Sequence, residues 1–439
     1  MQRINASLLL RARRTASVLA ITVLAGCATR QPSVAPATPP TPATPVQPSS
    51  PPARPQPTAV QNQPGPEQGF AQWVKDFRAE MRAAGVGEAA LRDAFDNVQY
   101  LPRVIELDRS QPEFVRPVWD YLDTAVSAQR VATGQEKLVQ IRAAADAASA
   151  RYGVPSSIIV AIWGIESNYG GNFGNTPAID ALATLAYEGR RRDWARGELR
   201  SALKIIENGD IDHAHMIGSW AGAMGQTQFL PSNFLRYAVD ADGDGKRDIW
   251  GSMPDVMAST ANFLASSGWQ RGQPWGAEVQ LPSGFDYSRA DSSIRQPSSQ
   301  WAALGVRSMD GRPLPDFADG AILLPAGSRG PAFLVGPNYR SILRYNNSDS
   351  YALAVSLLSQ RLEGGSGVQA QWPRDLTPLT RSQVRDLQAA LNQQGFSSGE
   401  PDGLLGPATR SAVRNYQRSA GLVADGFPTL ELLKRLQSP

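Results

Sequence analysis

One short stretch, residues 155–170, most constrains what this chain can fold into. It contains an unbroken apolar run from Ile158 to Ile165, opens with a proline and two serines, and closes with Gly170-Gly171. Proline and serine are typical of the first turn of a helix, and glycine of the position after its last turn. The stretch therefore predicts a helix that is apolar on almost every side.

Glu166 is the only acid on this predicted helix. Trp163 and Tyr169 stand at the i−3 and i+3 positions, which share a helix face with it. Apolar neighbours disfavour the charged carboxylate and raise its pKa, so we expect a neutral acid that can donate a proton at working pH. From this stretch alone a structural role stays open, in which Glu166 caps the helix end or pairs with an arginine.

Composition and charge narrow the class of protein. The 439 residues suffice for two or three domains, and 42% of them are hydrophobic, which is enough for a sizeable core. The net charge of +3, from 43 basic and 40 acidic residues, is too small to argue for nucleic acid, so we expect no nucleic-acid partner. Because there is one cysteine, no intrachain disulfide can form.

Residues 1–27 resemble a bacterial lipoprotein signal. They combine four arginines, an apolar run at 16–24, and the sequence Leu24-Ala25-Gly26-Cys27. The resemblance implies that Cys27 is lipidated and anchors the protein, and the absence of aspartate at Ala28 implies the periplasmic face of the outer membrane. A plain secretory signal and a buried thiol are the alternatives. Residues 28–67, rich in Pro, Ala, Thr, Ser and Gln, predict a disordered tether.

The region 68–363 predicts a mainly α (α+β) domain with a small β-bearing subdomain. Apolar periodicity indicates helices at 155–170, 194–208, 253–267 and 350–362. Between 276 and 337 the Gly, Pro and Ser content rises, and the short apolar pieces 321–324 and 333–335 indicate strands.

A linker at 364–378 and a three-helix module at 379–437 are expected to follow. The linker opens with Gly-Gly-Ser-Gly. In the module, Thr380 and Gln383 form a capping box, Gly395 is placed to end the first helix, and Pro407 to begin the second. A generic three-helix bundle is a complete physical account of this pattern.

The segment Ser219–Pro231 is the second candidate site feature. Its small residues let the backbone approach closely, and Gln226, Thr227 and Gln228 offer hydrogen-bond donors and acceptors. Such a surface suits a sugar with hydroxyl and acetamido groups. Tight helix packing is the alternative interpretation.

Three motifs together resemble one known family. Glu166–Gly170, then Asp180–Ala186, then 221–232 follow the order and spacing of the membrane-bound lytic murein transglycosylase B family, over roughly residues 70–362. The resemblance implies a lysozyme-like domain that cleaves the bond between N-acetylmuramic acid (MurNAc) and N-acetylglucosamine (GlcNAc), leaving a 1,6-anhydro sugar. The module at 379–437, with Asp402–Thr409, resembles a peptidoglycan-binding domain.

The resemblance also implies roles for individual residues. Glu166 would be both the acid and the base of the reaction, whereas a glycoside hydrolase normally uses two carboxylates. Phe263 stands where the family has a tyrosine, which puts a hydrogen bond there in doubt. The implied sugar contacts are Ser219, Gln228, Tyr345, Asn346 and Tyr121.

An acidic loop is the candidate metal site. Asp240, Asp242 and Asp244 occupy positions 1, 3 and 5 of an EF-hand pattern with glycine at position 6, but position 12 is Gly251 instead of glutamate. The resemblance implies that Asp255 supplies the later ligand. We expect at most a weak structural Ca²⁺ site, with a hydrogen-bonded turn as the alternative, and no cofactor required for the reaction.

Other chemistries fit the sequence poorly. The only histidines, His213 and His215, lie two residues apart, so a metalloprotease helix is missing and a Ser-His-Asp triad has few candidates. The expected function is that of a lytic transglycosylase in cell-wall turnover, a monomer whose partners are peptidoglycan and, through its lipid, the outer membrane. A hydrolytic muramidase and a non-catalytic peptidoglycan-binding lipoprotein are the alternatives.

Overall fold

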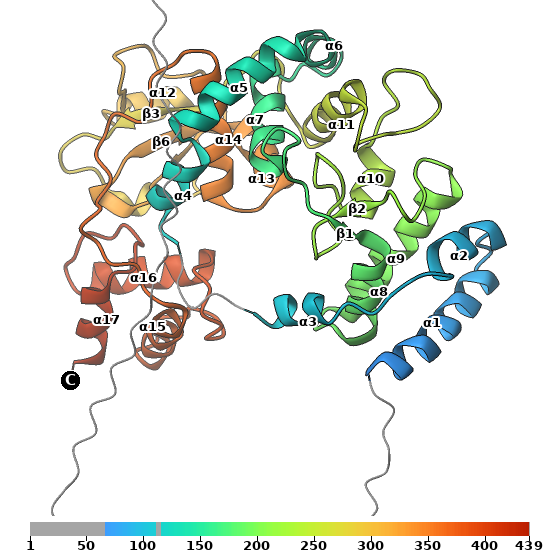
Figure 1. The fold of residues 1–439 in the computed structure, drawn as a ribbon. Coiled ribbons are helices and arrows are strands. Elements are labelled where there is room, and N and C mark those ends of the chain that lie inside the picture. The colour runs from blue at the N-terminus through green and yellow to red at the C-terminus, as the bar shows by residue number, and fades with distance from the viewer. Residues whose placement is uncertain (1–65, 111–115, 439) are drawn as a thin grey trace, which may run out of the picture. The chain divides into compact units, whose positions relative to one another are not determined.

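The structure is a computed structural model that describes residues 66–110 and 116–438 (Figure 1). Cys27, the predicted signal and nearly all of the predicted tether lie outside the described residues. Within the two described ranges, no helix combines the length and hydropathy that a membrane span requires. The described residues belong to one unit, Gln63–Pro439.

The main region is built from helices. Those before the glutamate-bearing segment are α1 (Pro66–Ala83), α2 (Glu88–Phe95), α3 (Pro102–Arg109), α4 (Val118–Ala125), α5 (Ala128–Gln140) and α6 (Arg142–Tyr152). The others are α7 (Ser156–Ser167), α8 (Ala178–Glu188), α9 (Arg192–Glu207), α10 (Pro231–Tyr237), α11 (Met253–Ser266), α13 (Pro337–Tyr345) and α14 (Asp349–Leu362). Two short strands, β1 (Thr176–Pro177) and β2 (Ile217–Gly218), pair antiparallel.

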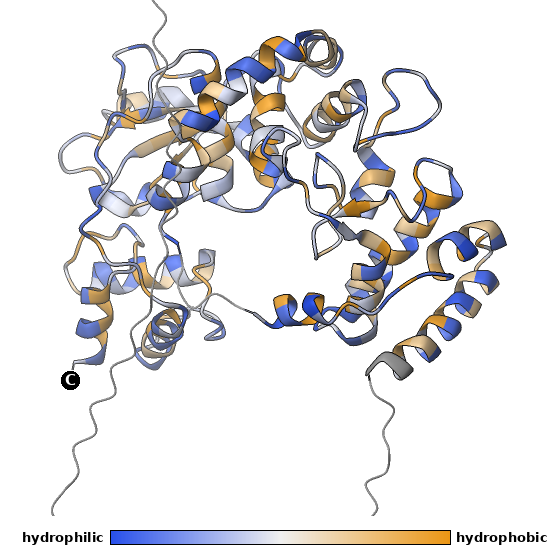
Figure 2. Ribbon diagram, in the orientation of Figure 1, coloured by the Kyte–Doolittle hydropathy of each residue, from blue (hydrophilic) through white to orange (hydrophobic). Residues whose placement is uncertain are grey.

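Helix α7 lies in the main hydrophobic core, as its sequence predicts. Every residue from Ser157 to Gly164 is buried. The helix packs against α5, α6, α11 and α14, and Figure 2 colours much of it as hydrophobic. Because apolar surface is removed from water on all sides, the helix and the acid at its end are held firmly in the fold.

A small antiparallel sheet forms the β-bearing subdomain. Its strand order is β4 (Arg307–Ser308), β3 (Gly276–Gln280), β6 (Ala332–Val335), β5 (Ala321–Leu323). Trp301 of α12 (Ser298–Ala303) packs with Phe317, Ile322 and Leu334 in a second core. Two 3₁₀ turns, Tyr287–Arg289 and Gly327–Arg329, complete this part.

The predicted linker, residues 364–378, is bound to the main region along much of its length. The carboxylate of Glu278 accepts hydrogen bonds from the backbone N–H groups of Gln369 and Ala370, each at 2.8 Å. Further along, Arg374 forms two hydrogen bonds with Asp123, at 2.7 and 2.9 Å. The predicted linker is therefore anchored to the main region by these contacts.

The C-terminal module has its own core between α15 (Arg381–Gln393), α16 (Pro407–Ser419) and α17 (Leu430–Gln437). The predicted capping box is present, since Thr380 accepts from the backbone of Gln383 and the Gln383 side chain accepts in return. Gln388 accepts from the N–H of Gly403 at 2.9 Å, and Gln417 from that of Gly426 at 2.8 Å. The loops that contain Asp402-Gly403 and Asp425-Gly426 are thus held by equivalent glutamine contacts.

The predicted fold class, mainly α with a small β-bearing subdomain and a helical module, is confirmed. The predicted helices correspond to α7, α9, α11 and α14, and the predicted strands to β5 and β6. These segments have strong periodicity or clear start and stop residues, which is why their types could be predicted.

Candidate active site

Helix α7 brings Glu166 to its last turn, where the backbone changes direction abruptly. Asn168 and Tyr169, directly after the helix, have φ values of 50° and 58°. Left-handed conformations are uncommon for residues other than glycine and are often found at functional sites. The N–H groups of both residues still bond to the helix, to the carbonyls of Gly164 and Trp163 at 3.1 and 3.3 Å. The acid is therefore presented from a tightly fixed helix end.

The hydroxyl of Tyr351, near the start of α14, donates a hydrogen bond to Oε1 of Glu166 at 2.6 Å. Glu166 is only partly exposed, and its burial raises its pKa to about 7. The hydrogen bond from Tyr351 lowers the pKa and is the smaller effect. At neutral pH a large fraction of Glu166 is therefore the neutral acid, able to donate a proton.

The raised pKa agrees with the expectation from sequence, but the surroundings differ in part. Tyr169 has left the helix, packs edge-on against Trp163 with ring centres 5.6 Å apart, and donates its hydroxyl to the Arg130 carbonyl at 2.9 Å. The hydrogen-bond partner of Glu166 is instead Tyr351, which the sequence analysis missed. Its aromatic character on the predicted helix 350–362 was visible, but nothing in the sequence pairs it with an acid 185 positions earlier.

Three tyrosines interact with Glu166. Tyr345, at the end of α13, stacks on Tyr351 with ring centres 6.4 Å apart and planes 13° apart. Burial and then the nearby Glu166 raise the pKa values of Tyr345 and Tyr351 well above the usual range, and raise that of Tyr121 of α4 as well. All three phenols therefore remain neutral donors at physiological pH.

The segment Ser219–Pro231 is a folded loop that is tied to both α7 and Tyr345. Oε1 of Gln226 accepts from the indole N–H of Trp163 at 2.8 Å, and its amide donates to the Trp250 carbonyl at 2.6 Å. The Tyr345 hydroxyl donates to the carbonyl of Thr227 at 2.7 Å. These contacts connect the loop to the helix that carries the acid.

Ser219 and Gln228 hold this loop in shape. Gln228 has a φ of 51°, and its amide donates to the carbonyls of Phe173 and Gly225, each at 2.9 Å. The Ser219 hydroxyl accepts from the N–H of Ala223 at 3.2 Å. Both side chains are partly exposed, so each retains hydrogen-bonding capacity toward solvent or a ligand.

The remaining sequence-predicted residues lie beside this cluster. Asn346 is exposed and directly follows Tyr345 at the C-terminal cap of α13. The ring centre of Phe263, where the sequence resemblance implied a tyrosine, lies 4.6 Å from that of Tyr345, and Phe263 supplies apolar contact without a hydroxyl.

In the described residues, no second carboxylate affects the pKa of Glu166. Asp180, the acid in the motif at the start of α8, is buried and bonded to Nε2 of His213 at 2.9 Å. That contact raises the pKa of His213. Among the described residues, Glu166 is therefore the carboxylic acid that interacts with these three tyrosines, and the Tyr351 hydroxyl bonds to it directly.

The acidic loop brings Asp240, Asp242 and Asp244 together, with a ligand oxygen of each within 4.8 Å of the others. Asp255, the fourth expected ligand, is fully buried and accepts backbone N–H groups of Ala241 and Asp248, both at 2.7 Å. Three hard oxygen donors in a tight turn fit Ca²⁺. Asp255 thus binds the backbone of this loop, and its role as a fourth ligand stays a prediction.

Together, the helical core, the small antiparallel sheet and the acid at the end of a buried helix define a lysozyme-like domain. Residues 69–360 match the family described as transglycosylase SLT domain, and the chain belongs to this family. Residues 380–436 match the putative peptidoglycan binding domain.

Three relatives illustrate the similarity. SltB3 of Pseudomonas aeruginosa, in a crystal structure in complex with NAG-anhNAM-pentapeptide, is 52% identical, with a TM-score of 0.82 over 84% of this chain and 100% of that one. The Escherichia coli lytic transglycosylase Slt35 in complex with calcium is 30% identical, with a TM-score of 0.56 over 68% and 93%. Membrane-bound lytic murein transglycosylase B of Escherichia coli is 37% identical over 48% of this chain. That alignment spans 57% of the relative's length.

Proposed function

We propose that this protein is a peptidoglycan lytic transglycosylase, which cleaves the β-1,4 bond between MurNAc and GlcNAc and leaves a 1,6-anhydro-MurNAc end. The observation that carries the proposal is the single acid of the site, Glu166, with its pKa raised to about 7 and its hydrogen bond to Tyr351. An inverting or retaining hydrolase uses two carboxylates, and no other carboxylate of the described residues affects this one. Further support comes from the ligand named with SltB3, which contains an anhydro sugar.

In the first step, neutral Glu166 donates its proton to the oxygen of the glycosidic bond. The bond from C1 of MurNAc to that oxygen breaks, the GlcNAc hydroxyl leaves, and positive charge develops on the MurNAc ring. A carboxyl group with a pKa near the working pH is well suited to this transfer. The Tyr351 hydroxyl, 2.6 Å from Oε1, stabilises the carboxylate that the transfer creates.

In the second step, the Glu166 carboxylate accepts the proton of the C6 hydroxyl of the same MurNAc, and O6 bonds to C1. The acid is regenerated, and no water enters the product. The attack has the advantage of an intramolecular reaction, because nucleophile and electrophile belong to one sugar ring. The cycle balances without a cofactor.

The proposed sugar contacts are Ser219, Gln228, Tyr345, Asn346 and Tyr121. The tyrosines would supply neutral hydroxyls and aromatic surface beside the acid, since their pKa values are raised. Ser219 and Gln228 would present polar groups from a loop whose backbone they also hold.

We further propose that Ca²⁺ is bound by Asp240, Asp242 and Asp244, with Asp255 as the later ligand. The ion would neutralise three neighbouring carboxylates and has no part in the reaction. Among relatives, support comes from Slt35, whose structure is named as a complex with calcium.

For the cell, we propose a monomer that is anchored through a lipid on Cys27 to the periplasmic face of the outer membrane, and that acts in cell-wall turnover. The support is the signal-like sequence of residues 1–27. Replacing Cys27 by alanine should release the protein from the outer-membrane fraction with its wall-cleaving activity unchanged. A mutant that still fractionates with the membrane would count against the anchor.

A turbidity assay on purified cell walls tests the catalytic proposal against a wall-binding lipoprotein. The wild-type chain should clear the suspension, and Glu166→Gln should bind the walls without clearing them. Because general acid–base catalysis contributes about 10²–10⁴-fold per transfer, the loss should approach background. Equal clearing by both proteins would overturn the role of Glu166.

A further inference from the structure

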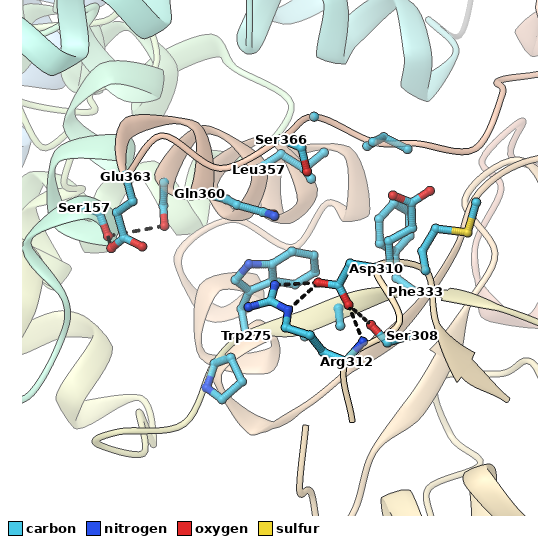
Figure 3. A pocket seen from close by; sticks show the side chains of 18 of the residues that line it. Ser157, Trp275, Ser308, Asp310, Arg312, Phe333, Leu357, Gln360, Glu363 and Ser366 are labelled. Atoms are coloured by element: carbon cyan, nitrogen blue, oxygen red, sulfur yellow. Dashed lines mark hydrogen bonds and ion pairs between the residues drawn. The ribbon is translucent and has the colours of Figure 1, made fainter. Parts of the chain in front are cut away.

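The two ends of α7 are fixed by different contacts. At its start, the hydroxyl of Ser157 donates to the carboxylate of Glu363 at 2.5 Å, beside a cavity of about 310 Å³ (Figure 3). Near its end, three residues before the acid, the indole N–H of Trp163 donates to Oε1 of Gln226 at 2.8 Å. The second contact joins the helix that carries the acid to the loop Ser219–Pro231, which carries two of the proposed sugar contacts.

Gln226 lies inside the fold, whereas the sequence indicated hydrogen-bonding groups for a sugar at this position. The side chain is 8% exposed, and both of its polar atoms have protein partners. Besides the bond from Trp163, its amide donates to the carbonyl of Trp250 at 2.6 Å, and its backbone N–H donates to the carbonyl of Ile249 at 2.9 Å. A Cβ at Gly170 would lie 2.3 Å from Oε1, so a glycine directly after the end of α7 is needed to admit this carboxamide.

The loop Ser219–Pro231 has little regular structure to fix its position. Gly222, Gly225 and Gln228 have φ values of 79°, 59° and 51°, all in the left-handed region. Such a backbone does not continue as a strand or a helix, so its place beside α7 depends on side-chain contacts. The buried bond from the indole to the carboxamide is one such contact, and leaving either group unpaired there would be costly.

The residue after Gln226 links the same loop to the hydrogen-bond partner of the acid. The carbonyl of Thr227 accepts from the hydroxyl of Tyr345 at 2.7 Å, and the ring of Tyr345 stacks on that of Tyr351. Tyr351 in turn donates to Glu166 at 2.6 Å. Two routes therefore lead from Gln226 to the acid, one through α7 and one through the tyrosines. A shift of Gln226 would change the position of the acid and of its hydrogen-bond donor together.

We propose that Gln226 is a positioning residue for the reaction, which holds the loop with Ser219 and Gln228 at a fixed distance from Glu166. Gln226 acts through these residues and does not touch the sugar. The inference rests on the proposed function, because a cleaved glycan needs its sugar contacts held in place relative to the proton donor. Losing this alignment moves the glycosidic oxygen away from the acid, and a displacement of about 1 Å can cost about a hundredfold in rate.

Steady-state kinetics of the full-length protein on soluble peptidoglycan fragments, arranged as a double-mutant cycle, tests this role. Gln226→Met removes the carboxamide but keeps the length of the side chain, and Trp163→Phe removes the indole donor. We expect each single variant to lower kcat/KM about tenfold, the effect of one lost buried hydrogen bond, with a higher KM as well as a lower kcat. The double variant should lose no more than the more impaired single variant, because both changes break the same bond.

Trp301→Phe is the matched control, because it also removes a buried indole donor, which binds the carbonyl of Gly320 at 2.9 Å. This tryptophan lies in the core of the β-bearing subdomain. The variant should lower the Tm and leave KM unchanged, since a partly unfolded sample contains fewer active molecules of ordinary affinity.

An unchanged KM in both single variants, or a double variant whose loss is the product of the single losses, would overturn the positioning role. Trp163→Phe breaks the bond without altering Gln226, so the KM test stands even if Gln226→Met does not fold. Calorimetric titration of Glu166→Gln with a GlcNAc–anhydro-MurNAc fragment supplies a readout without cleavage, and adding Gln226→Met should weaken binding about threefold. A wild-type chain that leaves cell walls intact would refute the proposed reaction, while equal binding in this titration would refute the role of Gln226.

Discussion

Replacing Glu166 by glutamine should stabilise the protein, and increasingly so as the pH rises. Burial raises the pKa of Glu166 in the folded protein to about 7, from an ordinary value of 4.5 that applies when the chain is unfolded. The folded state therefore binds this proton more tightly than the unfolded state. Below pH 4.5 both states are protonated, and the folded protein is not penalised. Between pH 4.5 and about 7 the unfolded chain releases this proton while the folded chain keeps it, so the stability falls; above about 7 both states are ionised and the loss is complete.

The size of the effect follows from the separation of the two pKa values. Each pKa unit corresponds to about 1.4 kcal/mol, so full ionisation of Glu166 costs about 3 kcal/mol as an upper limit. Glutamine has nearly the same shape, can accept the Tyr351 hydrogen bond and never ionises. The free energy of unfolding of Glu166→Gln should therefore equal that of wild type near pH 4 and exceed it by up to about 3 kcal/mol near pH 9.

Urea denaturation at a series of pH values measures this difference. Glu207→Gln is the control of opposite sign, because bonds from the Gly87 N–H and from Lys204 lower the pKa of Glu207. That variant should be less stable than wild type above pH 4.5, and the difference should shrink as the pH falls below 4.5 toward the lowered pKa of the folded state. A stability difference for Glu166→Gln that does not change between pH 4 and pH 9 would refute the raised pKa and the acid role built on it.

Three further predictions concern the acid's partner, the metal loop and the module. Tyr351→Phe removes the hydrogen bond that lowers the pKa of Glu166, so the alkaline decline of kcat/KM should move to higher pH while the rate falls about tenfold; an unchanged pH profile would exclude this contact from the reaction. Millimolar Ca²⁺ should raise the Tm of chelator-treated protein modestly, by binding the folded state, and Asp242→Asn should weaken the response; equal melting with and without Ca²⁺ would contradict the site. Deleting residues 379–439 should weaken sedimentation with cell walls but spare cleavage of soluble fragments; a folded but inactive truncation would show that the module takes part in catalysis.

The elements that the sequence predicted well are those whose signals are local. The stretch 155–170 predicts a buried helix because the apolar residues that determine it are consecutive in the sequence. Thr380 and Gln383 predict a helix start because the two partners of the capping box are three residues apart. The raised pKa of Glu166 could be predicted for the same reason, because its apolar sequence neighbours predict that the helix is buried.

Contacts between distant segments could not be predicted in this way. Tyr351 reaches Glu166 only because α14 packs on α7, which no local pattern encodes. The glycines that open residues 364–378 predict a linker, but they cannot show that the carboxylate of Glu278, about ninety positions earlier, binds its backbone. The backbone N–H groups that Asp255 binds approach it only in the folded loop, and its role as a metal ligand stays a prediction.

The central claim, that one acid directs an attack by the sugar's own hydroxyl, is tested most directly by digesting cell walls in heavy-oxygen water. Because O6 and not solvent bonds to C1, the muropeptide products should be lighter than hydrolysed ones by one water. Mass spectrometry should find no solvent oxygen at C1. Products that carry the heavy oxygen at C1 would identify a hydrolase and would contradict the single-acid account.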